Sequence, residues 1–330
     1  MEVNQILEIY NTGERNFKGA FLAGIDLSGA DLIGIILAGG NLQKANFTFA
    51  YLNRSDLSQT NLEEAILTGA NLYQAILVEA NLHRADLHGA ILQKADLRGA
   101  NLTLANLLDA NLIEADLRYA NLGNANLKGA CLRGANMRRE KRANATNLRG
   151  ANLDKADLRN IDMQGVDLKN ASLIGANLAE ANLRGADLTN ADLTGANLKG
   201  ALLTEVQLAG ARLVSANLAN AKLDRAILVD SDCTMANLEN ATLSDVKLTR
   251  ANLIQANLTF ARLNRSDLTR ANLYGAILRN ASLMEVFFAR TNLSSADLTS
   301  ANLIGADLSS ANTAGAIFEK AIMPDGQIFH

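Results

Sequence analysis

The strongest constraint on this chain is a leucine that recurs at every fifth residue. From residue 15 to 139, and again from 146 to 325, the chain divides into 61 pentapeptides, and the central residue is Leu in 52 of them. The residue two before the centre is Ala in 46 of the 61, and Asn or Asp usually stands between the two. We call this intervening position the outward slot. Such a repeat favours a fold in which one small packing unit recurs many times.

The five-residue period excludes an α-helix. Successive helical residues are rotated by about 100°, so a five-residue step turns each leucine by about 140° and no apolar stripe forms. In an extended segment, residues two apart point to the same side, which places the Ala and Leu of each pentapeptide together on the inside. The two remaining residues must turn the chain, and 20 of the 24 glycines occupy the last position, where positive φ is needed. The sequence therefore predicts an all-β fold.

Departures from the consensus indicate how many pentapeptides make one coil. Val replaces the inward Ala four times, each time eight pentapeptides after the last, at Val166, Val206, Val246 and Val286. Arg follows the central residue of every fourth pentapeptide at Arg98, Arg118 and Arg138. These two periods predict coils of four five-residue sides.

On these repeats the chain resembles the pentapeptide-repeat protein family over about residues 15–325. The resemblance implies a right-handed quadrilateral β-helix with leucine ladders inside. At four pentapeptides per coil it has about 15 coils, a rod roughly 70 Å long. The opening segment is similar to the short capping α-helix of many cyanobacterial members. Independently, Val3, Ile6, Leu7 and Tyr10 would share one face of a helix.

We expect one continuous domain with a protected beginning and a less protected end. Its predicted parts are a capping helix at 1–14, a first solenoid block at 15–139, a loop with a one-residue insertion at 140–145, a second block at 146–325 and a C-terminal tail at 326–330. The helix should cover the open edge of the first coil. Pro324, Asp325 and Gly326 indicate a turn with no second helix after it, so a homodimer through the C-terminal coil is a reasonable hypothesis.

Positive charge concentrates between residues 128 and 160, which we call the basic belt. This stretch holds nine Lys and Arg against three Asp and Glu, although the whole chain has a net charge of −3. If 140–145 forms one side with an extra residue, Arg159 stacks on the same face as the arginines at 98, 118 and 138. We predict a contact surface for an acidic or phosphate-rich partner, made of Arg98, Arg118, Arg138, Arg139, Lys141, Arg142 and Arg159. The alternative is that these side chains simply extend into solvent.

The sequence presents no catalytic, cofactor or metal site. His83 and His88 hold equivalent positions in consecutive pentapeptides and should diverge, whereas a metal needs three or four converging ligands. Cys131 should lie outward and Cys233 inward, about five coils apart and too far for a disulfide. The sequence has no Walker loop, dinucleotide fingerprint or nucleophile elbow. We therefore expect a protein that is not an enzyme and binds no cofactor.

The leading functional interpretation is a non-enzymatic structural or protein-interaction scaffold of unknown partner. The family resemblance adds an alternative, a DNA mimic that binds DNA gyrase or topoisomerase, but mimicry needs a dense negative surface. A third interpretation is binding of an anionic partner or nucleic acid through the arginines, although aromatics are only 4% and we do not expect nucleic acid. No apolar run approaches the length of a membrane helix, roughly 20 residues. The first residues lack a basic secretory start, so we expect a cytoplasmic protein.

Overall fold

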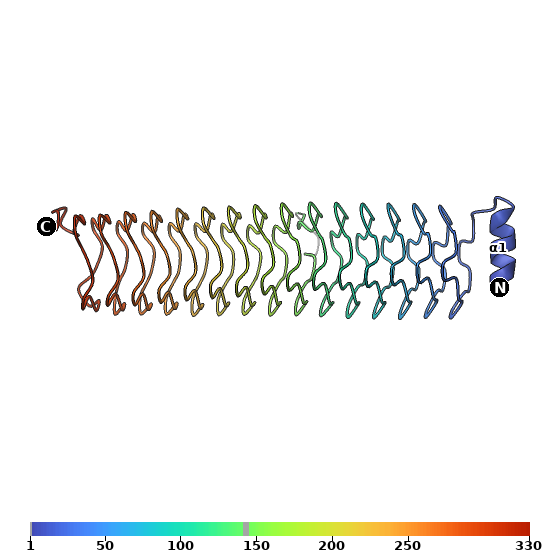
Figure 1. Ribbon diagram of the computed structural model, residues 1–330, viewed down its shortest axis with the longest axis horizontal. Coiled ribbons are helices and arrows are strands. Elements are labelled where there is room, and N and C mark those ends of the chain that lie inside the picture. Colours follow the sequence, from blue (N-terminus) through green and yellow to red (C-terminus); the bar gives the residue numbers. More distant parts are fainter. Residues whose placement is uncertain (1, 141–144) are drawn as a thin grey trace. The chain divides into compact units, whose positions relative to one another are not determined.

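The computed structural model describes residues 2–140 and 145–330. Within these residues the one α-helix is α1 (Val3–Asn11), and the remaining regular structure is a series of isolated β-bridges, almost all parallel, with no longer strands. The chain divides into two compact units, Met1–Asp167 and Leu168–His330. Each unit is a stack of coils (Figure 1). The expected all-β architecture is thus built from bridges of single residues.

Each coil consists of four pentapeptide sides, as the recurrence at every fourth pentapeptide predicts. Bridges join the outward slots of sides that lie one coil apart, for example Asn41 with Asn61 in the first unit and Asn197 with Asn217 in the second. The central Leu22 donates its N–H to the carbonyl of Asn41 at 2.8 Å, and Asn41 donates to Ala20 at 2.9 Å. Backbone groups of one coil are therefore satisfied by the next coil, which aligns the sides in flat walls.

The corners between sides are tight turns. The N–H of Ala196 donates to the carbonyl of Leu193 at 3.0 Å, and between them Gly195 has a φ of 65°. Residues with side chains adopt the same conformation at other corners, as Asn190 does with a φ of 58°. A hydrogen bond from the fourth residue to the first, with positive φ at the third, is the pattern of a type II turn.

The interior of the coils is filled by the repeat itself. Leu193 is 1% exposed and Ala196 is 0% exposed, and the same burial recurs along both units. Six inward positions hold a hydroxyl residue in place of Ala: Ser55, Thr60, Thr146, Ser231, Ser266 and Thr291. The Thr291 hydroxyl donates to the carbonyl of Leu268 at 2.7 Å, which offsets the cost of burying it.

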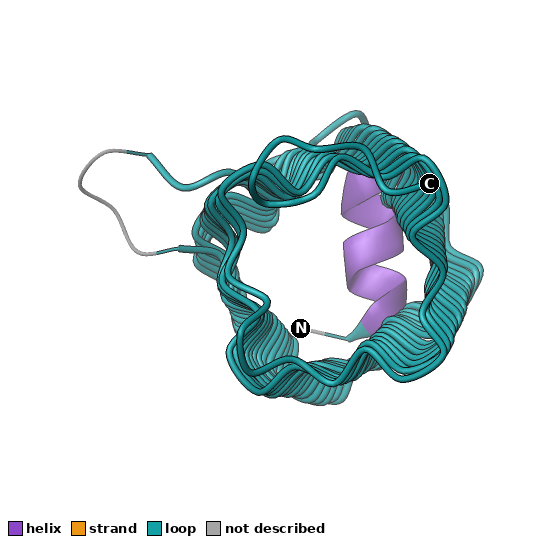
Figure 2. Cartoon of the chain, turned by 90° about the vertical axis from the view of Figure 1, so that its left-hand side faces the viewer, coloured by secondary structure: helices purple, strands orange, loops and turns teal. Residues whose placement is uncertain are grey.

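Helix α1 packs on the first coil of its unit. Its buried face carries Ile6 and Tyr10, and the Tyr10 hydroxyl donates to the carbonyl of Ile33 at 2.9 Å. The guanidinium of Arg15 lies 3.7 Å from the centre of the Tyr10 ring. Figures 1 and 2 show the helix lying across the open end of the first coil.

The insertion is not one side of a coil, as we had expected for residues 140–145. Asn136 bridges to Asp116, and the next side is already that of Asn147, which bridges to Asn121. Thr146 occupies the inward position of this next side and is fully buried. The sides of Asn136 and Asn147 are therefore consecutive, with no side between them, and 141–144 lie outside the described residues. The expectation failed because the centre of a side is nearly always a large apolar residue, and this segment contains only charged residues, Asn and Ala.

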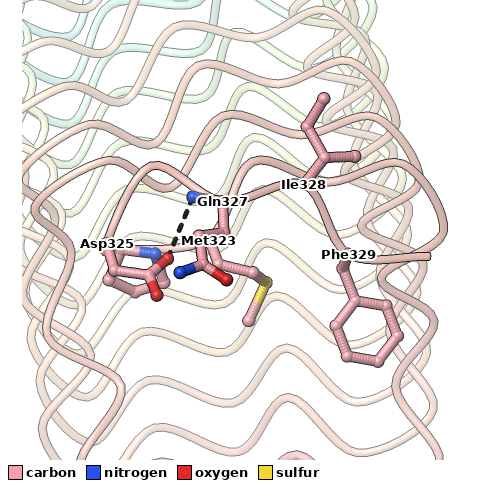
Figure 3. A pocket seen from close by; sticks show the side chains of 6 residues that line it. Met323, Asp325, Gln327, Ile328 and Phe329 are labelled. Atoms are coloured by element: carbon pink, nitrogen blue, oxygen red, sulfur yellow. Dashed lines mark hydrogen bonds between the residues drawn. The ribbon is translucent and has the colours of Figure 1, made fainter.

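The end of the second unit folds back on itself. Ile322 and Ile328 form an antiparallel bridge, and the ring of Phe329 lies 5.9 Å from that of Phe318. Residues 326–330, which we expected to form a tail, thus contribute a single antiparallel bridge at Ile328. A hollow of about 420 Å³ is lined by Met323, Pro324, Asp325, Gln327, Ile328 and Phe329 (Figure 3). Across the described residues, no helix is both long and apolar enough to traverse a bilayer.

Candidate functional site

Three of the arginines predicted as a contact surface, Arg98, Arg118 and Arg159, are engaged with carboxylates of their own repeats. Arg98 donates from Nε and Nη2 to the two carboxylate oxygens of Asp96 at 2.8 and 2.7 Å. Arg118 does the same with Asp116 at 2.9 and 2.6 Å. In each case the aspartate fills the outward slot and the arginine stands two residues later, so both side chains leave the same side of an extended segment. These bidentate pairs leave little net charge for a partner.

Arg118 is also tied to the first residue of the insertion. Its Nη1 donates to Glu140 Oε1 at 2.5 Å, and Arg98 Nε lies 3.9 Å from Asp116. A hydrogen bond from the Tyr119 hydroxyl and a second one from Arg118 lower the pKa of Glu140. The hydrogen bonds to Asp116 and Glu140 raise the pKa of Arg118. The predicted ladder of like charges is in fact an alternating network of acids and bases.

Arg159 does not stack with the other three arginines, which corrects our expectation. Its repeat bridges from Asp157 to Cys131, so it lies on the side that precedes the one carrying Arg138. Arg159 donates to Asp157 at 2.8 and 2.7 Å, and Arg133 lies 3.5 Å from the same carboxylate. The expected stacking of Arg159 is wrong because it assumed that residues 140–145 form one side of a coil.

The remaining predicted residues lie at or next to the insertion. Arg138 is exposed, and no carboxylate of the described residues lies within ion-pair distance of it. The backbone N–H of Arg139 donates to the carbonyl of Gln164 at 2.9 Å. Lys141 and Arg142 lie outside the described residues. The belt as a whole encircles a coil, because the residue after the centre is basic on four successive sides: Lys128, Arg133, Arg138 and Arg149.

The groups that could support metal or thiol chemistry are dispersed. In the described part of the chain, no three His, Cys, Asp or Glu side chains are arranged to hold a metal ion. His83 Nδ1 lies 2.7 Å from the Thr103 hydroxyl, and the exposed His88 is on the next side. Burial raises the pKa of the Cys233 thiol to about 12, so this cysteine is a poor nucleophile.

Sequence reasoning missed a second set of arginines, which the second unit aligns in one corner. Arg250, Arg270 and Arg290 are each the last residue of a pentapeptide, and each stands four pentapeptides after the one before. Backbone hydrogen bonds from Arg250 to Thr269 and from Arg270 to Ala289 place these corners on successive coils. This alignment could have been predicted from the sequence, because Arg250, Arg270 and Arg290 recur at every fourth pentapeptide, as the arginines at 98, 118 and 138 do.

Comparisons with known families identify the repeat. A model described as pentapeptide repeats matches in eight copies, over residues 16–48, 37–69, 65–103, 105–139, 143–170, 167–205 and 288–323. A second model, described as a pentapeptide repeat region, matches residues 201–278. No curated protein sequence matches the chain.

Several solved structures are similar to the chain. HetL, a pentapeptide repeat protein involved in heterocyst differentiation regulation in Nostoc sp. strain PCC 7120, is 30% identical, with 100% of both chains covered and a TM-score of 0.32. A second Nostoc pentapeptide repeat protein is 38% identical over 30% of this chain and 80% of its own, with a TM-score of 0.29. A pentapeptide repeat protein of the Arabidopsis thaliana thylakoid lumen is 36% identical over 36% of this chain and 68% of its own, with a TM-score of 0.26.

Proposed function

Because the chain belongs to the pentapeptide repeat family, whose members have a right-handed β-helix type fold, we propose that it is a non-enzymatic scaffold that binds a partner protein on its outer walls. The observation that carries this proposal is the filled interior. Leucines and alanines occupy the inside of both units with almost no exposure, so the chemistry available to a partner lies on the surface.

The outer walls suit binding better than catalysis. Asn101 Nδ2 donates to Asn81 Oδ1 at 3.0 Å, and Asn81 Nδ2 donates to Asn61 Oδ1 at 3.2 Å, which holds the outward slots of one wall in register. A rigid wall loses little conformational entropy when a partner binds. General acid–base chemistry, by contrast, needs a recess that removes one carboxyl group from water.

The two ends complete the proposal. We take α1 to cap a stack of about 15 coils, since its buried face closes the first coil.

At the other end, Thr313, Phe318 and Met323 are central residues that stay half-buried. We infer that a second copy covers this C-terminal coil. Light scattering should give a dimer for the wild type and a monomer for Phe329→Asp, with Phe287→Asp as the control that remains a dimer.

Cross-linking in the native cell tests the scaffold itself. A true partner should cross-link to the lysines of one wall and should be lost when outward residues of that wall are changed, but not when those of the opposite wall are changed. The proposal would be overturned by two results together. The wild type would cross-link no protein more strongly than the wall variants do, and the purified chain would turn over a substrate.

The purified protein and its variants also test the two alternative functions, a DNA mimic and a binder of anionic partners. Protection of DNA gyrase in a supercoiling assay would support a DNA mimic, which the small net charge of −3 does not favour. Charge reversal at Arg118 and Arg138 tests binding through the arginine ladder, and unchanged binding of anionic partners would exclude it. The ion pairs of Arg98 and Arg118 already weaken that interpretation.

A further inference from the structure

Several corners of the coils pair opposite charges. Residues at the last position of a pentapeptide form columns, in which each side chain faces its neighbour one coil away. Arg225 lies 2.8 Å from Glu205, and Arg265 lies 2.8 Å from Asp245, in both cases between successive coils. In the first unit Lys94 lies 3.4 Å from Glu114. A carboxylate one coil away is therefore the partner of several corner cations.

One column of the second unit carries three arginines in succession. Arg250 donates from Nε and Nη2 to both oxygens of Asp230 at 2.6 Å, which saturates that carboxylate. The next corner residues are Arg270 and Arg290, and the column continues with Ser310. Neither Arg270 nor Arg290 forms a salt bridge with any residue that the structure describes, and both side chains are exposed.

The neighbouring acids are already engaged. The Asp267 carboxylate accepts the N–H of Thr269 at 2.9 Å and the Thr249 hydroxyl at 3.0 Å. Asp307 accepts the N–H of Ser309 at 3.0 Å. Arg270 and Arg290 thus stand on adjacent coils, which are about 4.8 Å apart. Both residues are exposed, so their guanidinium N–H donors are accessible to a ligand from solution, and the two positive charges repel each other.

We propose that Arg270 and Arg290 form the docking point for a phosphorylated segment of a partner protein. A phosphate monoester carries a charge of about −1.5 to −2 and three acceptor oxygens, which match two guanidinium groups. A single carboxylate would neutralise only one of them. Phe287, in the same pentapeptide as Arg290, is 55% exposed and adds an apolar contact for the peptide chain. This inference rests on the proposed scaffold function and names the chemistry of its partner.

Fluorescence anisotropy with a labelled heptapeptide tests the assignment. The probe is Gly-Leu-Gly-phosphoserine-Gly-Leu-Gly, beside its unphosphorylated form, at low salt and pH 7.5. The proteins are the wild type, a double variant with Arg270→Gln and Arg290→Gln, and a matched control with Arg225→Gln and Arg265→Gln. We expect the wild type and the control to bind the phosphopeptide at least tenfold more tightly than the unphosphorylated peptide. The Arg270→Gln, Arg290→Gln variant should lose at least tenfold in affinity.

Several results would overturn this docking point. They are no binding by the wild type at millimolar peptide, unchanged binding by the double variant, an equal loss in the control, or equal affinity for the unphosphorylated peptide. Inorganic phosphate that binds as tightly as the phosphopeptide would assign the site to small anions instead. Far-ultraviolet circular dichroism verifies that all variants are folded. Failure here leaves a cross-linked partner on another wall intact, so it is distinguishable from failure of the scaffold proposal.

Discussion

The last residue of each pentapeptide determines which side chains the repeat tolerates. This residue has positive φ at nearly every described corner, whether it is Gly195 or Met235. Val, Ile and Thr occupy the last position in none of the 61 pentapeptides, although they are common at the preceding position, as in Ile33, Val78 and Thr194. A β-branched side chain at positive φ clashes with its own backbone, which explains the exclusion.

Gly195 separates this backbone effect from packing. A Cβ atom at Gly195 would meet nothing within 4 Å, so the cost of a substitution comes from its φ of 65°. We expect Gly195→Val to lower the free energy of unfolding by about 2 kcal/mol. Gly195→Asn should cost much less, because Asn tolerates this conformation. Urea unfolding measures both, and equal losses would contradict the explanation.

Leu193 tests the inward face of the repeat. Its side chain is 1% exposed inside the second unit, so Leu193→Ala removes buried methyl groups and leaves a cavity. We expect a loss of about 2–5 kcal/mol in the free energy of unfolding. Thr194→Ala is the control, since Thr194 lies on the outside and loses only its hydrogen bond to Asp192. A loss at Thr194 as large as that at Leu193 would show that the inward face is misassigned.

The inward and outward positions could be predicted from the sequence because they depend on a period of two within each side. The ion pairs of the arginines were missed for a related reason. Asp96 and Arg98 are two positions apart in an extended segment, so the same rule that put Ala and Leu together also brings this acid and base together. The total charge of a stretch does not show this pairing. The positions of the acid and the base within one side do predict it.

At the scale of the element, the insertion shows where sequence reasoning ends. The spacing from Met137 to Leu148 fits either one enlarged side or one ordinary step with the segment 140–145 left over. The register is decided by contacts between coils, such as the 2.8 Å hydrogen bond from Asn147 Nδ2 to Asn121 Oδ1. At the insertion, residues in contact between coils, such as Asn121 and Asn147, are separated by more chain than the four pentapeptides that separate them in the other coils. The sequence alone does not indicate this longer separation.

The asparagine ladder of this wall makes a further prediction. Asn101 donates to Asn81 at 3.0 Å, and its Oδ1 accepts the N–H of Thr103 at 3.2 Å. The Thr103 hydroxyl also donates to Asn101 Oδ1, at 2.8 Å. Asn101→Ala removes all three hydrogen bonds, and we expect the free energy of unfolding to fall by about 1–3 kcal/mol. Ile91→Ala in another outward slot is the control and should cost under about 1 kcal/mol. Thermal unfolding monitored by circular dichroism gives the comparison, and a neutral Asn101→Ala would mean that the ladder does not stabilise the wall.

At the scale of the whole molecule, the small net charge conceals many local ion pairs. Hydrogen bonds from Arg159 lower the pKa of Asp157, those from Arg250 lower the pKa of Asp230, and a hydrogen bond from the Ser309 side chain lowers that of Asp307. These aspartates belong to different repeats of both units. Since each repeat adds its own term, the stability of the chain should respond to acid as a sum of small contributions.

The direction of this response follows from the sign of the pKa changes. A carboxyl group whose pKa is lower in the folded state than the unfolded value of about 3.9 stabilises the fold at neutral pH, because the unfolded chain binds protons more readily. This contribution to the free energy of unfolding is fully present at a pH above the pKa of the unfolded state. It is lost as the pH falls through the pKa of the folded state. We expect the melting temperature to be nearly constant from pH 7 to about 5 and to drop steeply below about 4. Asp157→Asn should lower the melting temperature at pH 7 but much less at pH 3, where the wild-type carboxyl is also neutral. A melting temperature at pH 3 equal to that at pH 7 would show that these paired carboxylates do not stabilise the coils.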